Sequence, residues 1–397
     1  MFPFFQNWHY WQRTYLEAGI TAFLVAVVTM PVAIVVLRRL GVVDKATADK
    51  LHRRPVVRGG GIVIFLAFAV GVLLPNYREH AMNGVMVGAF ICMVVGAIDD
   101  FRGGMSATIK FITLVAVTLV MSSFGVKLNL FKAYPAVDLV LTVLWIVGVT
   151  SAFNALDNMD GLAGGLAAIV SAIYLVIAVQ AFLAVGTETG LSWFGLLAAG
   201  LIGANLGFLI FNFKPARIFM GDSGSFFMGF TLAALGVMGE WTEAEAALGV
   251  MGKWTQRLIS CTIPVLILGI PIFDFAYILI ARILRGETRS LRQIIEHCAL
   301  DHLSHRLTWI GFSQRQAVLF IYLAAAAMGI TGILLRNSTD LIDSVLGLGQ
   351  GFAIALIIVT LMAGAARRHK NVAAGQCEVT SDEAQRPVRP DAAKPKI

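Results

Sequence analysis

Residues 150–165 read TSAFNALDNMDGLAGG and join two long apolar runs of the chain. Asn154, Asp157 and Asp160 are three residues apart, so a helical backbone would place them near one face. A carboxylate at the edge of a bilayer needs water, a metal or a cationic ligand, and it is therefore a functional-site hypothesis. The alternative is that Asp157 and Asp160 only begin the next membrane helix, where the helix dipole favours anions. The stretch indicates a membrane protein and suits a divalent cation with phosphate.

The composition supports the membrane assignment. Of the 397 residues, 58% are hydrophobic and only 14% are charged, which is typical of polytopic membrane proteins and not of soluble enzymes. In such a protein a net charge of +7 orients the chain and attracts anionic head groups, so we expect no nucleic-acid partner. The four cysteines are widely scattered, and their spacing indicates neither a disulfide framework nor a zinc site.

The apolar runs set the expected number of membrane spans. Eleven runs have roughly spanning length, at residues 17–37, 61–75, 83–98, 108–125, 136–153, 161–185, 191–211, 225–239, 259–281, 317–335 and 345–366. Three of them are short for a span, at 61–75, 83–98 and 225–239, so ten is the alternative count. A short interfacial helix is expected near residues 240–258.

The positive charges set the expected orientation. If the N-terminus lies outside, the inner segments hold 24 of the 31 Lys and Arg residues, which is the bias of cytoplasmic loops. We therefore predict an all-α polytopic membrane protein with a periplasmic N-terminus and a cytoplasmic C-terminus. Residues 1–366 form the membrane domain, and residues 367–397 form a basic, disordered cytoplasmic tail.

A basic, glycine-rich stretch lies on the predicted inner face. His52 and Arg58 precede Gly59, Gly60 and Gly61 at the start of an apolar run. Basic side chains beside exposed backbone amides suit phosphate. The positive-inside rule alone would explain the arginines here, but it does not explain the glycines.

Paired carboxylates lie on the same face. Asp99 and Asp100 end the run at 83–98, and Lys110 follows. Neighbouring carboxylates repel each other, and oxygen-rich sites for Mg²⁺ use that negative potential. Asp222 stands in a Gly-Asp-Ser-Gly turn downstream of Asn212, where it is either a metal ligand or a helix cap.

The longest inner loop adds His302, His305 and Arg306. Two histidines three residues apart could bind zinc, but no Cys or acidic partner completes such a site nearby, and donors to a diphosphate fit better. Every candidate therefore falls on the cytoplasmic face, which indicates one active site for metal-assisted phosphoryl transfer between a soluble anionic donor and a membrane-embedded acceptor.

Rival classes make different predictions. A transporter would place acidic residues at the membrane midplane, and an intramembrane aspartyl protease would need a partner aspartate in a facing span and no metal. A CDP-alcohol phosphotransferase requires a DGxxAR motif, which fails after Asp160-Gly161.

With these residues in hand, the chain resembles the polyprenyl-phosphate N-acetylhexosamine-1-phosphate transferases of glycosyltransferase family 4. HRRPVVRGGG, IDD, NALDNMDGLAGG, NFKPARIFMGDSGS and DHLSHRL follow one another in the family's order, from about Asp44 to Gln316. The resemblance implies a fold of ten or eleven helices with a cytoplasmic cleft in the bacterial inner membrane. It also implies a UDP-amino-sugar donor, undecaprenyl phosphate as acceptor, and Mg²⁺ as cofactor, for which Mn²⁺ could substitute.

The resemblance assigns roles by motif. Asp99, Asp100, Asp157 and Asp160 are the catalytic candidates, and Asp222 would coordinate Mg²⁺ with Asp99 and Asp100. The candidates for substrate binding are His52, Arg58, Lys110, Asn154, Asn212, His302, His305 and Arg306.

Departures from the family pattern indicate the branch. The peptidoglycan branch has asparagine where Ser151 stands, lysine where Gly103 stands, and three histidines where the chain has Leu-Ser-His. We therefore expect transfer of a HexNAc-1-phosphate, most simply GlcNAc-1-phosphate, to undecaprenyl phosphate with release of UMP. That would be the first membrane step of a cell-surface polysaccharide such as O-antigen lipopolysaccharide or teichoic acid. The alternatives are a UDP-MurNAc-pentapeptide phosphotransferase of peptidoglycan synthesis and a membrane transporter, and a homodimer is left open.

Overall fold

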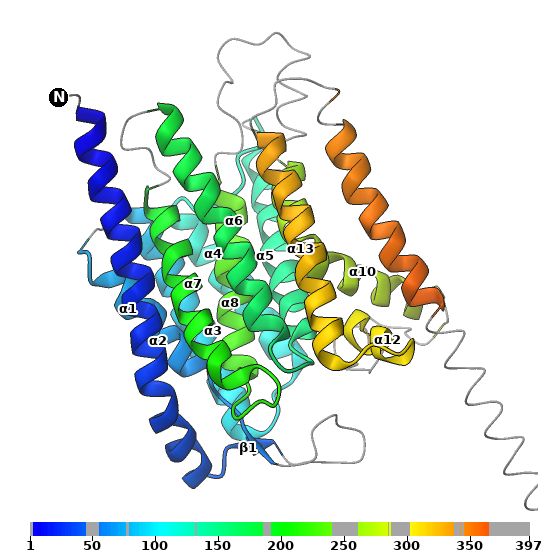
Figure 1. Ribbon diagram of the computed structural model, residues 1–397. Helices are drawn as coiled ribbons and strands as arrows, with labels where there is room; N and C mark the ends of the chain where they lie inside the picture. Colours follow the sequence, from blue (N-terminus) through cyan, green and yellow to red (C-terminus); the bar gives the residue numbers. More distant parts are fainter. Residues whose placement is uncertain are drawn as a thin grey trace, which may run out of the picture.

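The computed structural model describes residues 3–44, 55–76, 79–131, 133–185, 192–239, 261–284, 286, 302–336, 342 and 345–364. The described chain is helical apart from two short strands (Figure 1). Its labelled helices are α1 (Pro3–Arg39), α2 (Gly61–Leu73), α3 (His80–Arg102), α4 (Ala107–Ser123), α5 (Pro135–Leu156), α6 (Leu162–Val185), α7 (Ser192–Asn212), α8 (Gly221–Met238), α10 (Gly269–Leu284), α12 (Leu303–Trp309) and α13 (Gln314–Arg336). The strands are β1 (Val43–Asp44) and β2 (Val56–Val57). His52, the expected interfacial helix at 240–258 and the tail at 367–397 lie outside the described residues.

The all-α membrane architecture predicted from the apolar runs is confirmed. Seven described helices are long and apolar enough to cross a membrane, or eight if the bent pair Cys261–Ile267 and Gly269–Leu284 is one span. The runs at 61–75 and 108–125 form the shorter apolar helices α2 and α4. The count of eleven spans and the orientation of the chain remain predictions.

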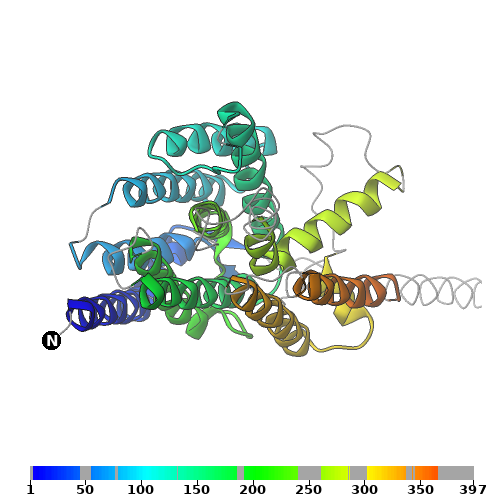
Figure 2. The same ribbon diagram turned by 90° about the horizontal axis from the view of Figure 1, so that it is seen from above.

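The helix α8 lies at the centre of the bundle. All its residues except Asp222 and Met238 are buried, and it packs against α2, α3, α5 and α6 (Figure 2). The outer helix α1 instead exposes large apolar side chains on one face, including Leu24, Val28 and Val32. Exposed apolar surface of this kind is what lipid contact requires, because the bilayer interior is itself apolar.

The run at 259–281 is bent by 84° at Leu268, between the helical segments Cys261–Ile267 and Gly269–Leu284. Pro271 follows the bend, and its ring nitrogen has no hydrogen to donate to the carbonyl of the residue four positions earlier, which is Ile267. The missing hydrogen bond accounts for a break at this point. The bend sets the direction of α10, which reaches one part of the site described next.

Candidate active site

Three carboxylates converge where α3 ends and α8 begins. One oxygen each from Asp99, Asp100 and Asp222 lies within 4.8 Å of the others. Asp99 and Asp100 are buried in the last turn of α3, and Asp222 is half-buried in the first turn of α8. Residues more than a hundred positions apart therefore form one acidic cluster, which we call the carboxylate cluster.

Glycines allow this close approach. The backbone at Gly221 has φ +72°, a left-handed conformation that glycine adopts without strain, and a Cβ there would collide with the Asp100 carboxylate. A Cβ on Gly96 would meet the backbone of Asp222. The glycine of the Gly-Asp-Ser-Gly turn is thus needed for the contact between α3 and α8.

The two members of the aspartate pair have different partners. Asp100 accepts hydrogen bonds from the backbone N–H groups of Asp222 (2.9 Å) and Ser223 (3.0 Å) and from the Ser223 hydroxyl (2.7 Å). It therefore satisfies the free N–H groups at the start of α8. Oδ1 of Asp99 is buried without a hydrogen-bond partner among the described residues. Such an orphaned carboxylate oxygen is suited to a cation.

Arg58 reaches the cluster because of a small backbone arrangement. Antiparallel pairing of β1 with β2 and a bridge from Val57 to Ile218 hold the two loops together. Beyond the bridge, the Gly60 N–H donates to the Phe219 carbonyl (2.9 Å). The chain around Arg58 is therefore fixed directly beside the start of α8.

Two cations neutralise the cluster. Arg58 contacts Asp100 through Nε (2.8 Å) and Asp222 through Nη2 (2.8 Å). Nζ of Lys110 lies 3.3 Å from Asp99, contacts Asp222, and sits 5.5 Å from the centre of the Phe226 ring. Burial lowers the pKa of the Arg58 guanidinium, but Asp100, Asp222 and Asp99 outweigh it, so the pKa is raised above its ordinary value.

The central acidic loop between α5 and α6 lies next to the cluster. Burial, with a further contribution from the charge of Asp222, raises the pKa of Asp157 to about 7. Asn154 donates to the Ser225 hydroxyl of α8 (2.7 Å). Asp160 accepts from the backbone N–H of Ala216 (3.2 Å). The loop is thus fixed to both α8 and the segment that precedes it.

The side chain of Asn212 makes hydrogen bonds to the backbone of two different segments. Its Oδ1 accepts from the Gly161 N–H (2.9 Å), and its Nδ2 donates to the Ile218 carbonyl (2.8 Å). The side chain therefore joins the acidic loop to the strand region. This position supports the shape of the site, while the predicted nucleotide contact stays a prediction.

The histidine motif forms the short helix α12. His302, His305 and Arg306 are all buried. His302 is bonded to Asp274, while Arg306 donates to the Met362 carbonyl (3.1 Å) and lies over the rings of Tyr277 and Trp309. These partners lie outside the carboxylate cluster, so the predicted phosphate contacts of these residues also stay predictions.

Sequence reasoning missed several residues that shape the site. They are Asn158, Ser223, Ser225, Asp274 and Tyr322. Asp274 had a usable signal, because it is a carboxylate within the apolar run at 259–281, the same feature that drew attention to Asp157. Tyr322 had none: its hydroxyl donates to the Gly161 carbonyl from α13, a contact that sequence does not reveal.

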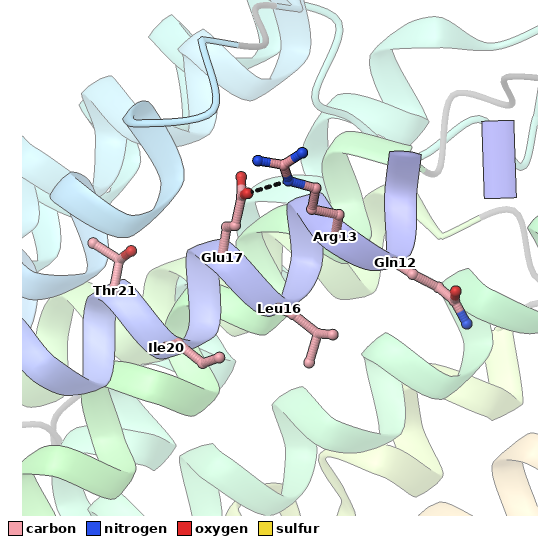
Figure 3. A pocket seen from close by; sticks show the side chains of 6 residues that line it. All are labelled: Gln12, Arg13, Leu16, Glu17, Ile20 and Thr21. Carbon is pink, nitrogen blue, oxygen red and sulfur yellow. Dashed lines mark hydrogen bonds and ion pairs between the residues drawn. The ribbon is translucent and has the colours of Figure 1, made fainter. Parts of the chain in front are cut away.

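A surface hollow elsewhere is not part of this site. It lies along the outer part of α1, where Gln12, Leu16 and Thr21 line it together with an ion pair between Arg13 and Glu17 (Figure 3). Arg13 is largely exposed, and exposed pairs of this kind contribute little to stability. All its lining residues come from one helix, whereas the carboxylate cluster is assembled from two, α3 and α8.

Known proteins are similar to this chain over most of its length. Residues 82–240, which include Asp99, Asp157 and Asp222, match the family described as glycosyl transferase family 4. The probable undecaprenyl-phosphate N-acetylglucosaminyl 1-phosphate transferase of Bacillus subtilis (strain 168) is 36% identical over 81% of this chain and 86% of that protein.

Two further relatives cover most of both chains. The undecaprenyl-phosphate alpha-N-acetylglucosaminyl 1-phosphate transferase of Escherichia coli (strain K12) is 30% identical over 80% of this chain and 83% of its own length. The decaprenyl-phosphate N-acetylglucosaminephosphotransferase of Mycobacterium tuberculosis (strain ATCC 25618 / H37Rv) is 28% identical over 87% and 89%. From this identity and coverage, the chain belongs to glycosyl transferase family 4, the polyprenyl-phosphate N-acetylhexosamine-1-phosphate transferases.

Proposed function

We propose that the protein transfers GlcNAc-1-phosphate from UDP-GlcNAc to undecaprenyl phosphate and releases UMP. The observation that carries this proposal is the carboxylate cluster with its two cations, Arg58 and Lys110. The names of the relatives support GlcNAc-1-phosphate as the transferred group and a polyprenyl phosphate as the acceptor.

The donor set of the cluster fits Mg²⁺. Mg²⁺ prefers oxygen ligands and is held in proteins by carboxylates together with substrate phosphates. Asp99, Asp100 and Asp222 offer such oxygens, and the buried Oδ1 of Asp99, which has no hydrogen-bond partner among the described residues, fits a cation best. When bound, Mg²⁺ would neutralise charge on the phosphoryl oxygens of the donor.

The residues of the chain supply alignment and charge. In the reaction, an oxygen of the lipid phosphate forms a bond to the β-phosphorus of UDP-GlcNAc, and the bond from that phosphorus to the bridging oxygen breaks, so UMP leaves. Two anions must meet, and Arg58 and Lys110 are placed to offset their repulsion. The lipid phosphate is largely ionised at neutral pH, since phosphate monoesters have a second pKa of about 6. A general base is therefore optional, although Asp157, with a pKa of about 7, is able to exchange a proton at this pH.

The test is a product assay on the purified protein. With UDP-GlcNAc, undecaprenyl phosphate and Mg²⁺, we expect UMP and a lipid that carries both the sugar and the β-phosphate. Release of UDP would mean that sugar alone is transferred, which would overturn the proposal. Decaprenyl phosphate and UDP-MurNAc-pentapeptide serve as rival substrates. A higher kcat/KM with the latter would place the chain in the peptidoglycan branch.

We further propose that the site faces the cytoplasm across the bacterial inner membrane. The Lys and Arg distribution supports this orientation. A reporter that is active only in the cytoplasm should be active when fused after Gly311 and silent when fused within residues 240–250. The reverse pattern would overturn the orientation without affecting the chemistry.

A further inference from the structure

A buried carboxylate outside the cluster holds the histidine motif. Asp274 of α10 is 1% exposed. Its Oδ2 lies 2.8 Å from Nδ1 of His302, and its Oδ1 accepts the backbone N–H of Leu303 at 2.7 Å. Both oxygens are therefore used by the first residues of the motif, which follows α10 only after a long intervening segment.

Packing does not explain an acidic residue at this position. A buried carboxylate is unfavourable unless it is paired, and in the described part of the chain the side chain that pairs with Asp274 is that of His302. An apolar residue would fill the same space in α10 without this desolvation cost. The carboxylate is thus suited to the histidine rather than to the core.

The contact determines which nitrogen of His302 carries a proton. A carboxylate only accepts hydrogen bonds, so Nδ1 must be the donor, and Nε2 is left for another partner. An Asp–His pair of this kind fixes both the orientation and the tautomer of the ring.

The other side of α12 is fixed as well. The Ser304 hydroxyl donates to Oδ1 of Asn158 at 2.6 Å, and Asn158 directly follows Asp157 in the central acidic loop. The helix is held between α10 on one side and the acidic loop on the other. If the contact between Asp274 and His302 were lost, α12 could therefore not shift as a whole to restore the position of His302.

We propose that Asp274 is a positioning residue for donor binding, which fixes His302 as an Nδ1–H imidazole whose Nε2 accepts a hydrogen bond from a hydroxyl group of the nucleotide sugar. This inference rests on the proposed function. Its chemistry predicts the effect of one subtle change, Asp274→Asn. The amide keeps an oxygen for the Leu303 N–H but turns its NH2 group toward His302, which forces Nδ1 to become the acceptor and moves the proton to Nε2.

The experiment combines kinetics with a direct measurement of the tautomer. Asp274→Asn, His302→Gln and the double variant are compared for UMP release from UDP-GlcNAc. We expect Asp274→Asn to lower kcat/KM by about 10- to 100-fold, the usual loss when the partner of a functional histidine is removed. In the His302→Gln background the same change should cost less than about threefold, because both substitutions disable one unit.

Asp138→Asn is the matched control. Asp138 is also buried, is also on a membrane helix, and also accepts hydrogen bonds from backbone N–H groups, those of Leu130 and Phe131, but no histidine of the described residues pairs with it. We expect its kcat/KM to stay within about twofold of wild type once folded protein is counted. Equal losses in the two variants, or full additivity with His302→Gln, would overturn the proposal.

NMR of ¹⁵N-labelled histidine separates this inference from the proposed function. The signal of His302, identified by its absence in His302→Gln, should report Nδ1–H in wild type and Nε2–H in Asp274→Asn. If wild type is inactive with UDP-GlcNAc, the proposed function fails, yet the tautomer is still measurable. An Nε2–H tautomer in wild type would overturn the role of Asp274, even if Asp274→Asn failed to fold.

Discussion

The two ends of α5 each place an aspartate within the protein, in opposite settings. Asp138, in the first turn, accepts hydrogen bonds from the backbone of Leu130 (3.2 Å) and Phe131 (3.1 Å). Asp157, just after the last turn, has the charges of Asp222 and Arg58 as its main neighbours. Asp138 is satisfied by fixed backbone donors and closes a loop. Asp157 lies near charged side chains, and burial is the main cause that raises its own pKa to about 7.

The contrast indicates how to separate a structural carboxylate from a functional one in a membrane protein. Loss of contact with water does not by itself distinguish them, because Asp138 is buried, Asp157 is partly buried, and both positions are costly for a carboxylate. Their partners do distinguish them. The backbone N–H groups around Asp138 are fixed in place, whereas the charged side chains around Asp157 can bind a ligand instead. Substitutions at the Asp157 end should therefore affect turnover, and substitutions at the Asp138 end should affect stability.

The largest effect is expected for Asp222→Asn. The change replaces a negatively charged ligand of the carboxylate cluster with a neutral side chain of similar size. Loss of metal-assisted charge stabilisation amounts to several kcal/mol, or roughly 10³-fold or more in kcat. The melting temperature in detergent should change little. Activity with Mg²⁺ near the wild-type level would exclude Asp222 as a metal ligand.

A smaller effect, on stability without metal, is expected for Arg58→Gln. Removing Arg58 leaves Asp100 buried without its cation, which should cost about 1–3 kcal/mol in the presence of a chelator. Added Mg²⁺ should raise the melting temperature of this variant by more than it raises that of wild type, because the ion replaces the lost positive charge. Arg13→Gln, which breaks an exposed ion pair on α1 (Figure 3), is the control and should show no such response. Equal responses of the two variants would argue against Mg²⁺ binding at the cluster.

The opposite outcome is expected for Asp138→Asn. Hydrogen bonds to a charged acceptor contribute about 1.5–3 kcal/mol, so weakening them should lower the melting temperature while kcat/KM of the folded protein is retained. Thermal unfolding followed by circular dichroism, together with the UMP assay, measures both quantities. A loss of turnover with normal stability would remove the distinction between the two ends of α5.

A further effect is expected in the pH dependence of stability. Asp157 has a folded pKa of about 7 against an ordinary value of 3.8, so between these values the folded state binds more protons than the unfolded state. Stability should therefore fall as the pH rises from about 4 to about 7, and the slope should be smaller in Asp157→Asn. Melting temperatures in chelator across this range test the sign. A slope unchanged by the substitution would mean that Asp157 titrates normally.

Much of the fold was predictable because membrane helices are recognised in a sequence by the length of their apolar runs. The bend in the run at 259–281 was not, since Pro271 can kink a helix or be accommodated in it, and only the packing decides. Likewise the sequence places Asp99 and Asp100 at the end of one span, but nothing in it tells them apart. The difference between them arises from Gly221, whose left-handed backbone turns the N–H groups of α8 toward Asp100 alone.

The site residues on α12 show the same limit. His302 was predictable as a candidate from its motif, but its partner Asp274 lies 28 positions earlier on a different helix. Pairing across such a distance depends on the direction of α10, and hence on the bend before it. Sequence reasoning finds the groups that carry charge and leaves open which of them meet.

The burial of α8 also bears on how the protein is made. Buried polar groups of this helix, Ser223, Ser225 and Thr231, are hydrogen-bonded to other groups of the protein, and α8 falls outside the set of described helices apolar enough to cross a membrane by themselves. Its packing partners α2, α3, α5 and α6 all precede it in the chain. During synthesis they are therefore already available when α8 leaves the ribosome, so its insertion can be guided by protein instead of lipid.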